Sequence, residues 1–270
     1  MNLNELYQQA YYKNKSGMIF CGDCVQIMQK MDDACIDLTI TSPPYDNLRT
    51  YNGYCFDFEN VAKELYRVTK DGGVVVWIVG DATIKGSETG TSFKQALFFK
   101  ECGFNLHDTM IWQKISPFQH KNRYIPCFEY MFVLSKNTPP KTVNLICDRK
   151  NKWAGTKVHG SERQTNGKTK PFSDVQCSKN VKEYGARYNI WDMPSEKSNK
   201  TGHPAVFPEQ LANDHILSWS NPNDIVFDPF MGSGTTAKMA MLNNRRFIGC
   251  EISEEYCNII KNRLNNVTYN

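Results

Sequence analysis

The chain has 270 residues, 40% of them hydrophobic, and carries 32 Lys or Arg against 28 Asp or Glu, a formal net charge of +4. This length favours one domain with an inserted lobe and a sizeable core. The sequence contains no run of eighteen apolar residues and no signal-peptide pattern, so we expect a cytoplasmic protein that does not span a membrane. Its ten cysteines are too sparse for a disulfide scaffold, and Cys21-x-x-Cys24 lacks two further nearby ligands, so we expect reduced thiols and no metal.

Strands and helices are predicted to alternate along the chain. Short apolar runs predict strands at residues 18–21, 36–40, 74–79, 109–112, 130–134, 224–228 and 247–251. Apolar residues at helical spacing predict helices at 58–69, 93–102 and 209–219, near 235 and after 253. This alternation indicates an α/β protein with a mainly parallel sheet and helices on both faces.

The stretch Thr41-Ser42-Pro43-Pro44-Tyr45 follows one of these strands. Two consecutive prolines fix φ and donate no hydrogen bonds, so they stiffen a loop at the carboxyl end of a strand, where open α/β sheets bind ligands. The Ser42 hydroxyl, the backbone carbonyls and the Tyr45 ring suit a flat, amine-bearing ring such as a nucleobase. The alternative is a proline-stiffened turn with a core tyrosine. The polar residues 46–54 fit either a loop that closes over the base, with Arg49 near a phosphate, or an ordinary surface loop.

Basic residues are concentrated in one segment of the chain, residues 113–200. Residues 113–200 hold 17 Lys or Arg against 7 Asp or Glu, a net +10, and the rest of the chain nets −6. From 136 to 200 the periodicity disappears and aromatic residues are scattered among basic ones. This composition favours contact with a nucleic acid, the alternative being a solvated charged loop. The candidate residues for contact with the nucleic acid are Arg49, Lys114, Arg149, Lys152, Arg163 and Arg187.

A glycine turn occupies residues 228–237, between a predicted strand and a predicted helix. Glycine allows a ligand to approach the backbone closely, and a helix N-terminus offers free N–H groups to an anion. Glu251 ends the next strand, 17 residues after Gly234, close to where a βαβ unit places a ribose-binding carboxylate. Without a lysine at the required spacing the turn is not a P-loop; a dinucleotide site or a purely structural turn stays open.

Taken together, S-P-P-Y at 42–45 and F-D-P-F-x-G-S-G-T-T at 227–236 resemble the motifs of the β-class DNA amino-methyltransferases, in the β-class order. The resemblance extends over most of the chain and includes Gly22-Asp23, Gly80-Asp81 and the stretch 203–208. It implies a Rossmann-like methyltransferase fold. It also implies a catalytic, S-adenosylmethionine-binding domain at 18–135 and 201–270 and an inserted target-recognition region at 136–200.

The resemblance assigns roles to individual residues. It implies that Asp23 contacts the cofactor adenine, although Asp23 is also placed to cap a helix, and that 203–208 flanks the methionine part of the cofactor. The implied catalytic residues are Ser42, Pro43, Pro44 and Tyr45. The candidate cofactor-binding residues are Asp23, Thr41, His203, Phe207, Asp228, Pro229, Phe230, Gly232, Ser233, Gly234, Thr235 and Glu251.

The target base is less well defined than the reaction. Serine at the first motif position is associated in the family more with N4-cytosine, and aspartate or asparagine with N6-adenine, so the sequence leans slightly to cytosine. Double-stranded DNA is the expected partner; RNA, a second copy of the chain and a cognate restriction endonuclease stay open. Two alternatives come from other functional classes. A nicotinamide-dependent oxidoreductase would leave the S-P-P-Y loop unexplained, and a DNA-binding protein without catalytic activity would leave the intact motif residues unexplained.

Overall fold

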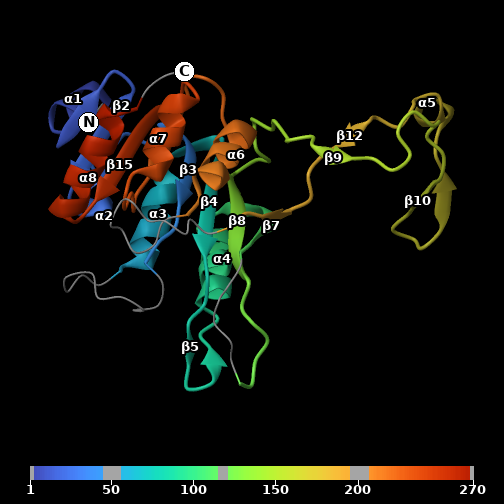
Figure 1. The fold of residues 1–270 in the computed structure, drawn as a ribbon, viewed down its shortest axis with the longest axis horizontal. Coiled ribbons are helices and arrows are strands. Elements are labelled where there is room, and N and C mark those ends of the chain that lie inside the picture. The colour runs from blue at the N-terminus through green and yellow to red at the C-terminus, as the bar shows by residue number, and fades with distance from the viewer. Residues whose placement is uncertain (1–2, 45–55, 115–120, 195–206, 268–270) are drawn as a thin grey trace. The chain divides into compact units, whose positions relative to one another are not determined.

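The structure, a computed structural model, describes residues 3–44, 56–114, 121–194 and 207–267 (Figure 1). It divides into a main unit, Met1–Asn144 with Asn189–Asn270, and an insert unit, Leu145–Tyr188. None of the described helices is both long and apolar enough to cross a membrane.

A nine-stranded sheet forms the centre of the main unit. In spatial order its strands are β1 (Tyr12–Asn14), β2 (Gly17–Cys21), β15 (Arg246–Glu251), β14 (Ile225–Asp228), β3 (Ile36–Thr41), β4 (Thr69–Val79), β8 (Phe128–Lys136), β7 (Phe104–Gln113) and β13 (Ile190–Asp192). From β2 to β4 every pairing is parallel. β8 runs antiparallel to both of its neighbours, and β1 is antiparallel to β2. The carboxyl ends of β2, β15, β14, β3 and β4 therefore share one edge, which we call the carboxyl edge.

Helices cover both faces of this sheet, as the alternation of elements predicts. One face packs against α1 (Leu3–Gln8), α2 (Cys24–Met28), α3 (Phe58–Val68) and α4 (Thr91–Glu101). The other packs against α6 (Glu209–Trp219), α7 (Thr235–Leu242) and α8 (Glu254–Asn265). The confirmed fold class is α/β, with a mixed, mostly parallel sheet.

Strand β4 shows why the sequence pattern predicts this architecture. Val75, Trp77 and Val79 belong to the hydrophobic cluster under α3 and α4, and the alternate residues 74, 76 and 78 belong to the cluster on the other face. Successive side chains of a strand point to opposite faces, so a continuous apolar run is buried on both sides. Each of these residues is at most 1% exposed.

The insert unit is built from short elements. It contains β9 (Arg149–Lys150), β10 (Ser161–Arg163), β11 (Thr169–Pro171), α5 (Asp174–Cys177) and β12 (Tyr184–Gly185). β9 pairs with β12 and β10 with β11, both antiparallel. The insert unit spans fewer residues than the expected region 136–200, because the residues on either side of it belong to the main unit. Asn144 N–H donates to Ser218 O, and Ile190 pairs with Ile111 in the sheet.

Candidate active site

The two sequence motifs meet at the carboxyl edge. β3 and β14 are adjacent parallel strands, with Leu38 opposite Val226. Thr41 ends β3 and Asp228 ends β14, and the Thr41 hydroxyl donates a 2.7 Å hydrogen bond to Asp228 Oδ1. Ser42 follows directly. A loop near the start of the chain and one near its end therefore share one edge because their strands are neighbours in the sheet.

Asp228 joins three elements at this edge. Besides Thr41, it accepts hydrogen bonds from Phe230 N–H at 3.1 Å and from the Thr236 hydroxyl at 2.7 Å. Its side chain is fully enclosed, and burial raises the pKa of this carboxyl to about 6 even though the three hydrogen bonds favour the ionised form. Asp228 thus fixes β3, the glycine turn and α7 relative to one another.

The glycine turn needs glycine for two separate reasons. Gly232 and Gly234 have φ of 54° and 82°, in the left-handed region that side chains disfavour. A Cβ on Gly234 would also lie 2.7 Å from Ile260 Cγ2 of α8, so the turn packs closely against that helix. Gly234 is the N-cap residue of α7, which directs the first N–H groups of the helix toward the turn.

Glu251, at the end of β15, is 9% exposed. It accepts hydrogen bonds from Gly232 N–H at 2.8 Å and from Ser253 N–H at 2.9 Å. Burial raises its pKa, with backbone N–H groups acting in the opposite direction. Its contact with a ribose stays a prediction, and the structure adds that Glu251 holds the glycine turn in place.

Asp23 lies next to Glu251 on the same edge. Cys21, which ends β2, is opposite Glu251, and Gly22 N–H donates to Glu251 O at 2.9 Å. Asp23 caps α2 by accepting from Gln26 N–H at 2.9 Å, so the helix-cap reading holds. Apart from its two chain neighbours, no atom of the described residues lies within 4 Å of a Cβ built on Gly22. Open space therefore adjoins two carboxylates at the ends of neighbouring strands.

A network of cationic side chains that no sequence motif indicates contacts the glycine turn. Arg263 of α8 donates to Ser233 O and Oγ at 3.0 Å and to Thr235 Oγ1 at 3.1 Å. The same guanidinium donates to Glu209, in the first turn of α6, at 2.6 Å, and Lys238 also donates to Glu209 at 2.6 Å. Burial alone would raise the pKa of Glu209, but the two cations lower it. Sequence spacing gives no sign of this network, because its members lie on three different helices.

The remaining predicted site residues are only partly described. Pro43 and Pro229 are buried, and Ser42, Pro44 and Phe207 are half-buried. Phe230 is half-buried and makes an edge contact with Phe56, with ring centroids 5.4 Å apart. Tyr45, Arg49 and His203 lie outside the described residues.

The predicted DNA-binding residues occupy both units. In the insert unit, Arg149 lies over the Tyr188 ring at 5.0 Å and Lys152 over the Trp153 ring at 5.2 Å. Arg149 lies in β9 and Arg163 in β10. The Arg187 guanidinium donates to Asp148 at 2.9 Å, and this hydrogen bond lowers the pKa of Asp148.

Lys114 lies in the main unit and forms an ion pair with Glu129. Its ammonium also lies 5.2 Å from the centroid of the Trp112 ring. A phosphate contact by Lys114 stays a prediction, and it requires the lysine to exchange this carboxylate for DNA.

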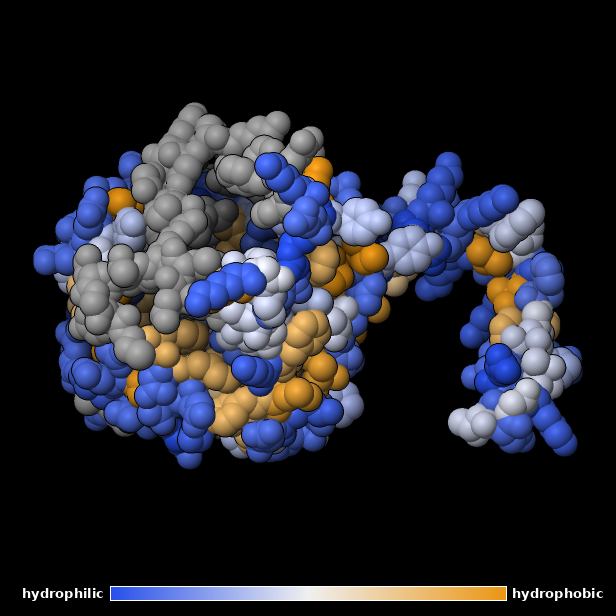
Figure 2. All heavy atoms as spheres, turned by 90° about the horizontal axis from the view of Figure 1, so that it is seen from below, coloured by the Kyte–Doolittle hydropathy of each residue, from blue (hydrophilic) through white to orange (hydrophobic). Residues whose placement is uncertain are grey.

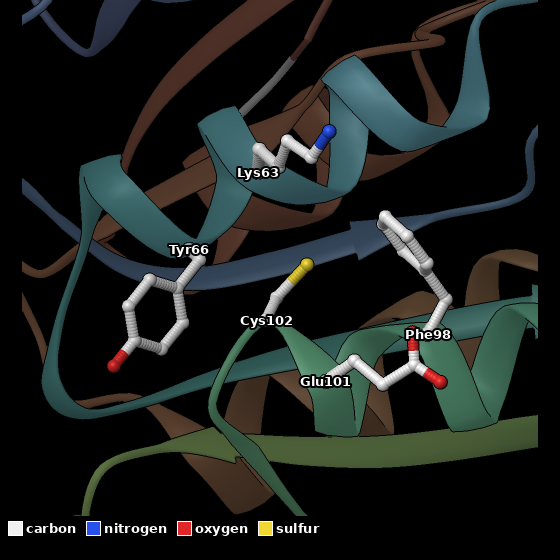
Figure 3. Close-up of a pocket in the computed structure, with 5 residues that line it drawn as sticks. All are labelled: Lys63, Tyr66, Phe98, Glu101 and Cys102. Carbon is white, nitrogen blue, oxygen red and sulfur yellow. The ribbon is translucent and has the colours of Figure 1, made fainter.

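A separate pocket of about 270 Å³ lies between α3 and α4, lined by Lys63, Tyr66, Phe98, Glu101 and Cys102 (Figure 3). Several of these residues lie at the C-terminal ends of their helices. β4 starts at Thr69, directly after α3, so these helix ends lie by the start of β4, opposite the carboxyl edge. The pocket is therefore not part of the candidate active site. Within the described ranges, no group of three or more His, Cys, Asp or Glu is arranged to hold a metal ion.

The donor and acceptor groups at the carboxyl edge fit S-adenosylmethionine. Acceptors at Asp23 and Glu251 suit adenine and ribose, and the open space at Gly22 leaves room beside them. A glycine turn at β14 and a stiff, acceptor-bearing loop at β3 complete a site of the class found in Rossmann-like methyltransferases.

Comparison with known proteins assigns this chain to a family. Residues 36–262 match the N6_N4_Mtase family model, described as DNA methylase, and the chain belongs to that family. It is 61% identical over 247 residues to the orphan methyltransferase M.BamHII of Bacillus amyloliquefaciens, covering 88% of this chain and 92% of that protein. The chain is therefore an S-adenosylmethionine-dependent DNA methyltransferase, as the sequence predicts.

Solved structures show the same fold. The PvuII DNA methyltransferase, described as cytosine-N4-specific, matches with a TM-score of 0.71 at 22% identity, covering 96% of this chain and 91% of that chain. M1.HpyAVI in complex with S-adenosylmethionine matches with a TM-score of 0.63 at 24% identity, covering 92% and 99%.

Proposed function

We propose that this methyltransferase modifies the N4 amine of cytosine in double-stranded DNA, with the N6 amine of adenine as the alternative target. The observation that carries the proposal is the position of Ser42, directly after the strand end that Thr41 fastens to Asp228. The lean to cytosine rests on serine at this motif position. The nitrogen lone pair of either amine is delocalised into a ring, so both amines are weak nucleophiles and need the same activation before methyl transfer.

The main role we assign to the loop is to orient the amine. We propose that Ser42 Oγ and the Pro43 carbonyl accept the two amine hydrogens, which directs the nitrogen lone pair toward the methyl group. Serine is a weak base, so positioning, and not complete proton removal, is its contribution. When bound, S-adenosylmethionine supplies an electrophilic methyl on its sulfonium.

The cofactor would be held by the residues that converge on the carboxyl edge. We assign the adenosine end to Asp23 and Glu251, and the methionine end to the glycine turn with Phe207. The connection from Thr41 through Asp228 to Phe230 spans the two halves of the site, which supports a fixed distance between amine and methyl group.

The target base is inaccessible inside a duplex, so the base must rotate out of the helix to reach Ser42. We assign stacking on the extruded base to Tyr45. We assign the insert unit to contact with DNA, because ten Lys or Arg and four Asp or Glu fall within residues 145–188. Trp153 and Tyr188, exposed at 65% and 67%, add stacking surfaces beside these cations.

Partners other than DNA form a second part of the proposal. M.BamHII is named an orphan methyltransferase, which favours an enzyme that works without a cognate restriction endonuclease. We place the activity in the cytoplasm, where bacterial DNA is found. Light scattering of the purified protein distinguishes one copy from a homodimer.

The test of the proposed role of Ser42 is to measure methyl transfer and cofactor binding separately. Ser42→Ala should lower kcat by about a hundredfold or more while the Kd for S-adenosylmethionine stays within about threefold. Thr138→Ala, which removes an exposed hydroxyl of the main unit just after the end of β8, serves as the matched control. Wild-type turnover by Ser42→Ala would remove the assigned role.

The target base is determined by digesting methylated DNA and separating its nucleosides. N4-methylcytosine is expected, and N6-methyladenine would move the assignment to the alternative. Sequencing of modified positions gives the recognition site.

A further inference from the structure

Two segments project together from the carboxyl edge, and neither takes part in the site described above. The first is residues 80–90, which contain the hairpin of β5 (Thr83–Ile84) and β6 (Ser87–Glu88). The second is residues 121–127, directly before β8. We call the two segments the edge arm. In Figure 1 they run side by side beyond the end of the sheet.

The edge arm starts close to the catalytic loop. Thr41, the residue before Ser42, is opposite Trp77 in β4, and β4 ends two residues later at Val79. Val79 is opposite Tyr130 of β8. Both segments of the arm therefore leave the sheet at the edge where the target base must enter.

The arm is held together by polar contacts. Arg123 donates to Gly86 O, and its guanidinium is 3.4 Å from Glu88. At the base of the hairpin, Asp81 accepts from Ser92 N–H at 2.9 Å and Thr89 N–H donates to Ala82 O at 3.0 Å. The two segments thus form one projection, and both of its carboxylates are engaged within the protein.

The outer surface of the arm combines apolar side chains with cations. Tyr124 is fully exposed, and Ile84 and Ile125 are 54% and 46% exposed. Lys85 and Lys121 are exposed next to them. Figure 2 is seen from below, the side on which the arm projects, and shows hydrophobic and hydrophilic residues next to one another on this face. Apolar groups gathered on a projection mark an interaction surface, and the lysines favour a polyanion over a second copy of the chain.

We propose that the edge arm enters the DNA at the target site and that Tyr124 fills the space that the extruded base leaves. This inference rests on the proposed base extrusion. An aromatic or apolar side chain inserted between bases recovers part of the stacking that extrusion breaks, and lysines on either side of it contact phosphates. Tyr124 is a positioning residue: it touches the DNA and acts on the reaction by stabilising the open duplex.

The test compares two duplexes that contain the recognition site. In one the target base is paired, and in the other the opposite nucleotide is abasic, so that extrusion requires less energy. Tyr124→Ala should lower kcat/KM at least about tenfold on the paired duplex and recover to within about threefold of wild type on the abasic duplex. Tyr124→Phe should retain activity on both, and Leu242→Ala, an exposed apolar residue at the end of α7, should behave as wild type.

Three results would overturn the inference. The first is wild-type kcat/KM for Tyr124→Ala on the paired duplex, and the second is an equal loss on both duplexes. The third is a wild-type dimer that Tyr124→Ala converts to a monomer, which would assign the arm to a second copy of the chain. Absence of methyl transfer to DNA by the wild-type protein would instead refute the proposed function.

Discussion

Replacement of Asp228 tests whether one carboxylate unites the two halves of the site. Asp228→Ala leaves the Thr41 and Thr236 hydroxyls and the Phe230 N–H without their acceptor. Each buried polar group left unsatisfied costs about 1–3 kcal/mol. Thr236 has an alternative acceptor, Ile40 O at 3.5 Å. At pH 4.5, where the folded carboxyl is protonated and no buried charge is removed with it, we expect Asp228→Ala to lose about 3–5 kcal/mol in the free energy of unfolding.

Asp228→Asn should behave differently. The amide oxygen can still accept from Thr41 and Phe230, and the amide N–H can donate to Thr236 Oγ1 while that hydroxyl donates to Ile40 O. The substitution also removes the penalty of a buried charge. We expect Asp228→Asn to be at least as stable as the wild type at pH 7.

The difference between wild type and Asp228→Asn should depend on pH. The folded pKa of Asp228, about 6, lies above its ordinary value of 3.8, so the unfolded chain loses this proton first as pH rises. Stability from this group is present below about pH 4 and is lost as pH rises through 6. Relative to Asp228→Asn, the wild type should lose about 2 kcal/mol between pH 4.5 and 7.

Urea denaturation followed by tryptophan fluorescence, repeated across this pH range for all three proteins, measures these differences. Subtracting the variant from the wild type cancels the other titrating groups. A pH-independent difference between wild type and Asp228→Asn, or an Asp228→Ala protein within about 1 kcal/mol of wild type at pH 4.5, would refute the reasoning.

Three further substitutions test other parts of the structure. Burial lowers the pKa of His215 to about 3, so stability from this group is lost as pH falls below the unfolded value of 6.5. In urea denaturation, the wild type should lose about 2 kcal/mol relative to His215→Phe between pH 7 and pH 5. A difference between the two proteins that does not change with pH would contradict this. Gly234 and Gly86 have nearly equal φ values of 82° and 83°, but a Cβ on Gly234 would contact α8 closely whereas one on Gly86 would meet open space. Gly234→Ala should therefore lower the free energy of unfolding by about 2 kcal/mol more than Gly86→Ala does. Equal losses would exclude the close contact as a cause. Arg263→Gln should raise the Kd for S-adenosylmethionine about tenfold in calorimetry, because the guanidinium holds the glycine turn, whereas Lys261→Gln on the exposed side of α8 should leave it unchanged; an unaltered Kd for Arg263→Gln would separate the network from the cofactor.

The regular elements of the main unit could be predicted because their signal is local. The helix expected at 209–219 matches α6, and the expected run 74–79 lies within β4. β4 begins earlier, at Thr69, because Thr69 is opposite Ile36 in the sheet, a contact that local composition does not encode. The edge strand β13 was not predicted for the same reason, since its three residues are defined by pairing with β7.

The candidate site was predictable residue by residue but not as a network. The motifs identified Asp228, Glu251 and the glycine turn. They did not show that Asp228 binds Thr41, 187 positions away in the chain, or that Glu251 accepts from Gly232. No sequence pattern indicates a role for Arg263, because an arginine near the end of an amphipathic helix is common. Its role is seen only in the structure, where it contacts Ser233.

The position of the N-terminal segment has a consequence for how such genes can be rearranged. Tyr11 and Tyr12 donate hydrogen bonds to Asn258 and Asn265 of α8, at 3.0 and 2.7 Å. The start of β1 and the last described helix, α8, are therefore neighbours, and a short linker that joins these two parts of the chain would need to span little distance. Because β3 and β14 meet through the sheet and not through the connecting chain, a circularly permuted polypeptide opened in a surface loop should rebuild the same catalytic edge with its two motifs in reversed order.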